Sequence, residues 1–465
     1  MSAPRADHPS PKEAVETEDA FLRNHTYIPR AGNVGPAPSF TIPTLGEQKV
    51  ANTWVQGPFT NGIRTLMTPL YHYDKILQPP EYAEVAGPRK NLFFDPTETT
   101  AAIVTCGGLC PGMNNVIRHL VLTMHYTYHV KQVLGFRFGY EGVAGLHEPK
   151  VLTPAVVADI HRHGGSLLGT SRGSQDAGKM VDNLVRLGVN ILFTVGGDGT
   201  LNGAQYLVDE ITARGLKIGV VGVPKTIDND ICYVDATFGF NTAVARSMGA
   251  IWSVHDEARS AIGGIGVVKL MGRDAGFIAL HSCLSNGDVN IVLIPEVRFD
   301  LQKVLAYVEE RLRTAGHCVI VVAEGAGQHL FEGLPDTYDA SGNRLQKDIG
   351  HFLSTKIQEY LKAKHVQHTL KYVDPSYIIR AASADPFDSL FCMCLATNAV
   401  HAALAGKTDM VICHHHNTFI NVPISRAIHF IKRVNPAGPL YQIMLENTGM
   451  PANIGEDSPV STPKN

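Results

Sequence analysis

The chain has 465 residues, 44% of them hydrophobic and 18% charged, with 40 basic residues against 43 acidic ones. This length exceeds what one simple core holds, so we expect two domains. The balanced charge provides no positive field for nucleic acid or an anionic membrane, and we expect neither as a partner. The eight scattered cysteines indicate reduced, mostly buried thiols in a reducing compartment.

No targeting or membrane segment is predicted. The first 21 residues are polar and partly acidic, which argues against a secretory signal or a transit peptide. The longest apolar stretch, residues 390–404, is interrupted by Thr397, Asn398 and His401 and therefore indicates a buried helix. We expect a cytoplasmic protein.

Residues 1–96 are rich in proline and show no long helical period, which predicts an extension, partly disordered at first, that then wraps the core or a neighbouring subunit. After it, short apolar runs predict strands at residues 101–105, 191–195, 217–223, 265–269, 289–294 and 318–323. Thr153-Pro154 is a typical helix start, and further helices are predicted at 242–257 and 301–314. This alternation predicts an α/β fold with parallel-rich sheets covered by helices on both faces.

A cluster of charged and polar residues follows the predicted strand 217–223. Residues 223–230 read VPKTIDND, and they bring an ammonium, a hydroxyl and two carboxylates to a strand end, where open α/β sheets place their ligands. Metal-assisted proton abstraction needs one carboxylate as base, others beside a metal, and a cation to balance charge. Taken alone, an Asp-rich turn explains the pattern about as well.

Glycine-rich loops follow two other strands. Residues 105–115 read TCGGLCPGMNN and have a phosphate-loop spacing of glycines, but they lack the Lys-Ser/Thr of a Walker A motif and indicate an anion site only weakly. Residues 196–200 read GGDGT, whose glycines let phosphates approach the backbone and whose Asp198 is suited to hold Mg²⁺. GGDGT also occurs in NAD kinases and lipid kinases, so it indicates nucleotide phosphates without fixing the substrate.

Two arginines lie in further loops. Arg172 ends the glycine- and hydroxyl-rich stretch 164–173, GGSLLGTSRG, and is suited to grip a phosphoryl group, although in isolation a surface arginine is the simpler interpretation. Arg273 lies in residues 269–277, KLMGRDAGF, between a predicted strand and a helix, where it can neutralise phosphate charge.

These loops together resemble those of the 6-phosphofructokinase family, most specifically in PKTIDND at 224–230 and MGRDAGF at 271–277. The resemblance covers about residues 97–430 and is closest to the ATP-dependent branch of plants and trypanosomatids, which is related in sequence to pyrophosphate-dependent enzymes. It implies a two-domain α/β fold with the active site between the domains. It also implies a glycolytic enzyme that transfers the γ-phosphoryl of ATP to the 1-hydroxyl of fructose 6-phosphate with Mg²⁺.

The resemblance implies roles for individual residues. Asp228 would be the base for the sugar hydroxyl, framed by Thr226 and Asp230, and Asp198 would bind Mg²⁺. Arg172 and Arg273 would stabilise charge on the transferring phosphoryl. The nucleotide site would be lined by Gly108, Tyr140, Arg172, Gly199, Thr200 and Gly203. The sugar phosphate would be held by Thr226, Asp228, Asp230, Met271, Gly272, Arg273, Glu324, Tyr377 and Arg380.

Departures from the family pattern bear on the donor and on regulation. Lys225 is typical of pyrophosphate users and of this ATP-using branch. Pyrophosphate users usually carry aspartate at position 199, where its charge crowds the nucleotide α-phosphate, so Gly199 favours ATP. Gly264 stands where bacterial members carry a subunit-bridging arginine, and Tyr377 replaces their histidine. The bacterial oligomer interface and regulatory pattern therefore do not carry over.

The resemblance also implies a homo-oligomer, with a tetramer favoured, and a nucleotide such as AMP as a possible effector. The nucleotide-binding domain would comprise residues 97–239 with 380–428, and the sugar-phosphate domain 240–379 with 429–455. The alternatives are a pyrophosphate-dependent enzyme, an NAD- or lipid-type kinase supported by GGDGT alone, and a non-catalytic regulatory subunit. The intact Asp198, Asp228, Arg172 and Arg273 argue against the last.

Overall fold

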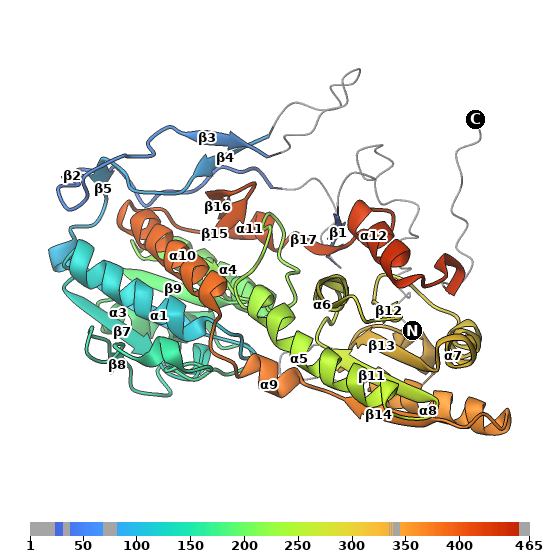
Figure 1. Cartoon of the computed structure of the whole chain (residues 1–465). Coiled ribbons are helices and arrows are strands. Elements are labelled where there is room, and N and C mark those ends of the chain that lie inside the picture. The colour runs from blue at the N-terminus through green and yellow to red at the C-terminus, as the bar shows by residue number, and fades with distance from the viewer. Residues whose placement is uncertain are drawn as a thin grey trace, which may run out of the picture.

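The apolar runs predicted as strands form two main sheets in a computed structural model of the chain (Figure 1). The structure describes residues 24–30, 38–67, 81–333, 335, 337 and 345–454. The predicted disorder at the start of the extension lies outside these residues. The larger sheet has nine strands and the smaller sheet four.

The larger sheet has the strand order β3-β4-β16-β15-β10-β9-β6-β7-β8. Its central strands β15, β10, β9, β6 and β7 are parallel, whereas β8, β16, β4 and β3 join its two sides antiparallel. In chain order the strands are β3 (Arg64–Leu66), β4 (Tyr82–Val85), β6 (Thr100–Thr105), β7 (Gln132–Phe136), β8 (Lys150–Val151), β9 (Ile191–Gly196), β10 (Gly219–Pro224), β15 (Met410–His415) and β16 (Thr418–Pro423).

Helices cover both faces of this sheet. Successive residues of β6 point to opposite faces, so Ala101 and Ile103 join the core under α1 (Met113–Leu122) and α10 (Pro386–Leu404). Ala102 and Val104 join the core under α3 (Ala177–Arg186) and α4 (Asp198–Ala213). Among the described residues, α10 alone is long and apolar enough to cross a membrane, but 61% of that apolar window is buried inside the protein, as in many core helices.

The smaller sheet is wholly parallel, with the order β12-β13-β11-β14. Its strands are β11 (Gly264–Leu270), β12 (Ile291–Leu293), β13 (His317–Ala323) and β14 (Thr369–Val373). Helices α5 (Phe240–Arg259) and α6 (Phe277–Asn286) pack together against it, as do α7 (Leu301–Ala315) and α8 (Ile349–Ala363). The short helix α9 (Ser376–Arg380) then leads back to α10.

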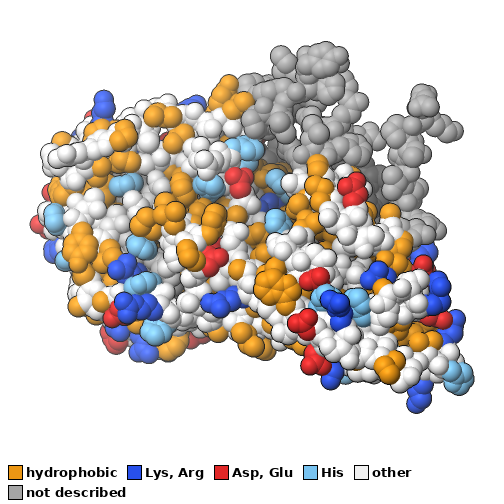
Figure 2. All heavy atoms as spheres, in the orientation of Figure 1, with side chains coloured by type: hydrophobic (Ala, Val, Ile, Leu, Met, Phe, Trp, Pro, Cys, Tyr) orange, Lys and Arg blue, Asp and Glu red, His pale blue; other side chains and the backbone are white. Residues whose placement is uncertain are grey.

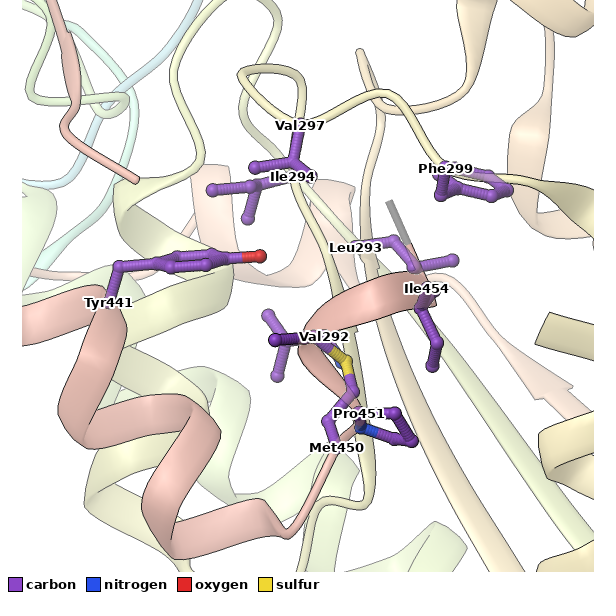
Figure 3. Close-up of a pocket in the computed structure, with 10 residues that line it drawn as sticks. Val292, Leu293, Ile294, Val297, Phe299, Tyr441, Met450, Pro451 and Ile454 are labelled. Atoms are coloured by element: carbon purple, nitrogen blue, oxygen red, sulfur yellow. The ribbon is translucent and has the colours of Figure 1, made fainter. Parts of the chain in front are cut away.

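The C-terminal part of the chain covers the outer strand of the smaller sheet. After α12 (Pro439–Thr448), Met450, Pro451 and Ile454 lie against Val292 and Leu293 of β12 (Figure 3). The N–H of Val292 points at the sulfur of Met450 at 3.4 Å. The edge strand is thus shielded from solvent by apolar side chains, which protects it from pairing with other chains.

The N-terminal extension is built into the fold at two places. Strand β1 (His25–Pro29) pairs antiparallel with β17 (Phe430–Val434), which follows the short helix α11 (Ile424–Ala427). Strands β3 and β4 extend the larger sheet, while β2 (Val50–Ala51) pairs with β5 (Asn91–Leu92). The described part of the extension therefore wraps the core of its own chain.

The predicted α/β fold is confirmed, and each predicted strand overlaps an observed one. The helix predicted at Thr153-Pro154 is wrong. The Thr153 hydroxyl does accept a hydrogen bond from the N–H of Val156 at 3.3 Å, but a single turn and the 3₁₀ helix Ile160–Arg162 follow. The β-branched Val156 and Val157 favour extended backbone over further helical turns. The division into two domains stays a prediction.

A buried ion network joins β4 of the extension to the core. Glu84 accepts hydrogen bonds from Arg89 at 2.6 Å, Lys407 at 2.8 Å and Asn421 at 2.7 Å. The side chains of Arg89 and Lys407 are only 5% and 12% exposed. Removing the carboxylate therefore leaves two buried cations without their counter-charge.

We expect Glu84→Ala to lower the free energy of unfolding by about 3 kcal/mol, because breaking a buried pair leaves uncompensated charge. The matched control is Glu98→Ala, since Glu98 pairs with Lys131 on the surface, where both side chains are more than half exposed. That control should change stability by less than about 1 kcal/mol. Urea unfolding of the two variants measures the difference, and equal losses would contradict the prediction.

Candidate active site

The predicted chemical loops meet at the carboxyl ends of the strands. Because β6, β9 and β10 are parallel neighbours, the loops that follow them lie at one edge of the larger sheet. Their contacts are direct: the N–H of Lys225 donates to Gly196 O at 2.9 Å, and the N–H of Gly107 donates to Ser171 O at 3.1 Å. The loops after β11 and β13 of the smaller sheet complete the cluster.

Lys225 supports the backbone of the first glycine-rich loop from the interior of the protein. Its side chain is buried, and its Nζ donates to Gly108 O at 2.8 Å. Burial lowers the pKa of Lys225. Arg172 lies on the outer side of the same loop, and its Nη2 is 3.5 Å from the point where a side chain on Gly108 would begin. The structure thus brings Gly108, Arg172 and Lys225 together.

The start of α4 presents the GGDGT loop. Asp198 is the first residue of this sixteen-residue helix, so backbone N–H groups at its N-terminus are available to an anion. Gly199 is exposed, and a side chain placed there would meet no atom within 4 Å. Tyr140 and Gly203 contact each other under the helix, and the Tyr140 hydroxyl donates to Thr200 O at 2.6 Å. A nucleotide contact of these two residues stays a prediction.

The PKTIDND loop turns sharply at Asn229. This residue has φ of +58°, a left-handed conformation that asparagine tolerates better than most residues. Its side-chain oxygen accepts hydrogen bonds from the N–H of Thr237 at 3.1 Å and from Nζ of Lys432 at 2.8 Å. The N–H of Asp228 donates to the Thr226 hydroxyl at 3.1 Å. The carboxylates on either side of Asn229 are therefore held on a fixed turn.

Asp228 is placed between the two sheets. Its carboxylate lies near the backbone of Arg273, after β11, and interacts electrostatically with Glu324, after β13. Its buried Oδ1 accepts no hydrogen bond from the residues that the structure describes. Burial, followed by the negative charges of Asp230 and Glu324, raises the pKa of Asp228 to about 8. A raised pKa and an unsatisfied oxygen are typical of a group reserved for chemistry.

The predicted sugar-phosphate residues are only partly brought together. Nη2 of Arg380 lies 3.8 Å from Oε1 of Glu324, and both side chains interact electrostatically with Asp228. Met271 is fully buried, and Gly272 has φ of +125°, which favours glycine. Tyr377 leaves 82% of its surface in solvent and points away from the packed part of the cluster.

The residues around Asp198 fit a magnesium ion that is bound together with phosphates. The buried Oδ1 of Asp198 accepts no hydrogen bond within the described part of the chain. Burial and the nearby charge of Asp230 raise the pKa of Asp198 to about 6, although Arg30 opposes the shift. The described residues contain no group of three or more acidic, histidine or cysteine side chains that would hold a metal alone. Mg²⁺ typically takes one or two carboxylates and completes its shell with water and substrate phosphates.

Several residues of this cluster were not predicted as site residues. Asp274 lies close enough to Asp230 and Arg30 for all three charges to interact. Lys432 comes from β17, and the guanidinium of Arg30, at the end of β1, lies 2.5 Å from Oδ2 of Asp198. Asn229 and Asp274 lie inside motifs already singled out, whereas Arg30 and Lys432 belong to no motif.

Two sheets with parallel cores, whose strand-end loops join an anion site to a carboxylate cluster, define an α/β protein with a candidate site for phosphorylated ligands. A model of the phosphofructokinase family matches residues 100–403. The chain therefore belongs to the phosphofructokinase family. The pocket in Figure 3 contains none of the predicted site residues and lies apart from this cluster.

Relatives cover nearly the whole chain. It is 51% identical over 426 residues to the ATP-dependent 6-phosphofructokinase of Entamoeba histolytica, covering 91% of this chain and 97% of that protein. It is 48% identical over 383 residues to the ATP-dependent 6-phosphofructokinase of Trypanosoma brucei brucei, covering 81% and 78%. The fold matches a pyrophosphate-dependent phosphofructokinase from Marinobacter aquaeolei with a TM-score of 0.62 and 20% identity, over 76% of this chain and 92% of that one. At this identity the structural likeness concerns the fold alone.

The raised pKa of Asp228 predicts how stability depends on pH. The folded carboxyl keeps its proton up to a pKa of about 8, whereas the unfolded carboxyl loses it near 3.8. The contribution of the Asp228 carboxyl to the free energy of unfolding is therefore fully present below about pH 4 and is lost as the pH rises through 8. Asparagine mimics the neutral carboxyl at every pH. We expect Asp228→Asn to raise Tm by about 2–4 °C at pH 8 and by less at pH 5.

Calorimetry at the two pH values measures this difference. Asp256→Asn is the matched control, because Asp256 is exposed on α5 and lies outside the site. A gain in Tm that is the same at both pH values, or the same in the control, would refute the assigned titration of Asp228.

Proposed function

We propose that this protein is an ATP-dependent 6-phosphofructokinase of glycolysis, which transfers the γ-phosphoryl of ATP to the 1-hydroxyl of fructose 6-phosphate. The observation that carries the proposal is the position of Asp228. Its unsatisfied carboxylate lies where the nucleotide-side loops of the larger sheet meet Arg273, Glu324 and Arg380 beside the smaller sheet. The relatives at 48% and 51% identity carry the same name.

Asp228 acts as the base in this proposal. Its buried Oδ1 is free to accept the proton of the sugar hydroxyl, and phosphoryl transfer needs orientation more than strong basicity. Thr226 and Asn229 hold the turn that aims the carboxylate. Because its pKa is about 8 without ligands, the positive charge of a Mg²⁺ ion bound with the nucleotide would favour the ionised, active form of Asp228.

Positively charged groups neutralise the phosphates from two sides of the site. Arg172, beside Gly108, and Arg273, beside Asp228, stabilise the transferring phosphoryl. Asp198 holds Mg²⁺, which supplies charge neutralisation on the phosphates when it is bound. Gly199, Thr200 and the loop at Gly108 receive the nucleotide together with Tyr140 and Gly203. The sugar phosphate is held by Thr226, Asp230, Met271, Gly272, Glu324, Tyr377 and Arg380.

The geometry around Lys225 and Gly199 favours ATP over pyrophosphate. The Nζ of Lys225 donates a hydrogen bond to the backbone oxygen of Gly108 inside the protein. Lys225 therefore supports the loop in the free protein and does not distinguish ATP from pyrophosphate as the phosphoryl donor. Gly199 faces open space at the start of α4, which leaves room for the α-phosphate and the nucleoside beyond it.

The first experiment compares ATP with pyrophosphate as donor for fructose 6-phosphate and Mg²⁺. Turnover with ATP alone is the expected result. Turnover with pyrophosphate alone would make the protein a pyrophosphate-dependent enzyme. Turnover with neither, also after addition of AMP, would support the non-catalytic alternative, whereas activation by AMP would identify the effector.

Gly199→Asp tests the donor assignment directly. An aspartate fits this exposed position without a clash and suits the first turn of a helix, so the fold should tolerate it. Its charge should raise KM for ATP by roughly tenfold, because it lies beside the α-phosphate. Gly249→Asp is the control, since Gly249 is also an exposed helical glycine with open space around it, on α5. An unchanged KM for ATP would rule out the proposed role of Gly199.

Assembly and location are further parts of the proposal. Tyr377, Ile378, Phe387 and Leu390, on α9 and α10, are between 57% and 82% exposed, which supports a homo-oligomer with a tetramer favoured. Apolar side chains are visible over α10 on the face shown in Figure 2. Binding of an effector such as AMP rests on the family resemblance, whereas a cytoplasmic location rests on the expectation drawn from the sequence.

A further inference from the structure

An arginine from outside the family match reaches into the candidate active site. Arg30 lies at the end of β1, 70 residues before the matched region begins at residue 100. Its Nη2 lies 2.5 Å from Oδ2 of Asp198, and the two side chains are 23% and 24% exposed. Hydrogen bonds between a guanidinium and a carboxylate are charge-assisted and stronger than those between neutral groups.

The position of Arg30 is fixed by its backbone and its neighbours. Its N–H donates to His429 O at 3.0 Å, and its Nε donates to Phe430 O at 3.2 Å. Strand β1 is further held because the Tyr27 hydroxyl accepts a hydrogen bond from the N–H of Tyr233 at 3.2 Å. The contact with Asp198 is therefore made by an anchored side chain.

Arg30 holds one oxygen of the Asp198 carboxylate. Oδ1 of Asp198 is buried and accepts no hydrogen bond within the described part of the chain, whereas Oδ2 lies 2.5 Å from the guanidinium of Arg30. A divalent cation that takes Oδ2 as a ligand must therefore displace the guanidinium or share the oxygen with it. Two cations at one carboxylate oxygen repel each other and compete for the same lone pairs.

The charges around Arg30 explain why the free protein needs a cation at this place. Asp198 interacts electrostatically with Asp230 and Asp274, and Arg30 lowers the pKa of both Asp198 and Asp274 against the larger effect of burial. Without a positive charge, three carboxylates would repel one another in a partly desolvated site. Arg30 supplies that charge at Asp198, while Arg433 lies 3.8 Å from Asp274 and has the larger effect on that carboxylate.

We propose that Arg30 is a further active-site residue, whose guanidinium occupies the position of the metal ion beside Asp198 while no metal is bound. In the free protein its guanidinium neutralises Asp198, and it leaves Oδ2 when a divalent cation arrives with the nucleotide. The N-terminal extension thereby sets the concentration of cation at which the site becomes occupied. The proposal rests on the proposed role of Asp198 as the magnesium ligand.

The test measures binding of Mn²⁺ to the full-length protein without nucleotide, by electron paramagnetic resonance of the free ion. Arg30→Gln should bind Mn²⁺ about tenfold more tightly than the wild type, because a competing charge-assisted hydrogen bond is gone. Arg30→Lys keeps the charge and should stay close to the wild type. Arg64→Gln removes an exposed arginine on β3 of the same extension and should have no effect.

The activity of the same variants gives a second measurement. The Mg²⁺ concentration for half-maximal turnover should fall in Arg30→Gln by a similar factor. Mn²⁺ binding that is unchanged in Arg30→Gln would overturn the proposal, and weaker binding would also overturn it, because Arg30 would then position Asp198 for the metal.

One more variant separates this proposal from the function on which it rests. Asp198→Asn should abolish the Mn²⁺ binding of both the wild type and Arg30→Gln. If Asp198→Asn leaves Mn²⁺ binding intact, the assigned metal ligand is wrong and the proposal falls with it. If Asp198→Asn abolishes binding but Arg30→Gln does not change it, the metal ligand stands and only the role of Arg30 is refuted.

Discussion

The buried ammonium of Lys432 is the interaction on which the geometry of the site depends. The ammonium donates to the side-chain oxygen of Asn229 at 2.8 Å and to Val234 O at 2.5 Å. The backbone N–H of Lys432 donates to Asp230 O at 2.9 Å. Burial lowers the pKa of Lys432 to about 8, but these acceptors and the ring of Phe277 at 5.2 Å surround the charge. One cation thus holds the turn that carries both carboxylates, and its desolvation is offset by hydrogen bonds to the same loop.

This arrangement makes the free site electrostatically unfavourable for Asp228. Lys432 is directed at the backbone and at Asn229, and the charge of Arg380 opposes the effect of burial and of the carboxylates on Asp228 without cancelling it. Burial and two neighbouring carboxylates then hold the pKa of Asp228 near 8. A carboxylate destabilised in this way gains most when a metal ion and the nearby arginines bring positive charge to it. The unfavourable charge on Asp228 lowers the stability of the free protein, and relieving it on binding therefore favours the liganded state.

The fold and the chemical loops could be predicted because both are local in sequence. Buried parallel strands give continuous apolar runs, and glycine with aspartate after such a run marks a strand end. Strand β14 was missed, since its alternation of polar and apolar residues from Thr369 to Val373 reflects an edge with partial exposure. Arg30 and Lys432 were missed for another reason. Their contacts with Asp198 and Asn229 span 168 and 203 residues, and a single charged residue gives no pattern.

Both residues lie on one ribbon, which links the ends of the chain to the site. Arg30 directly follows β1 and Lys432 lies on β17, and the two strands pair along their whole length from His25–Val434 to Pro29–Phe430. Both strands lie outside residues 100–403, where the family match is found. The ribbon therefore contacts Asp198 with one strand and the Asp228 turn with the other. A change in the pairing of β1 would alter the charge at Asp198 and the support of the turn together, so the N-terminal extension is part of the candidate site as much as the loops that carry the sequence motifs.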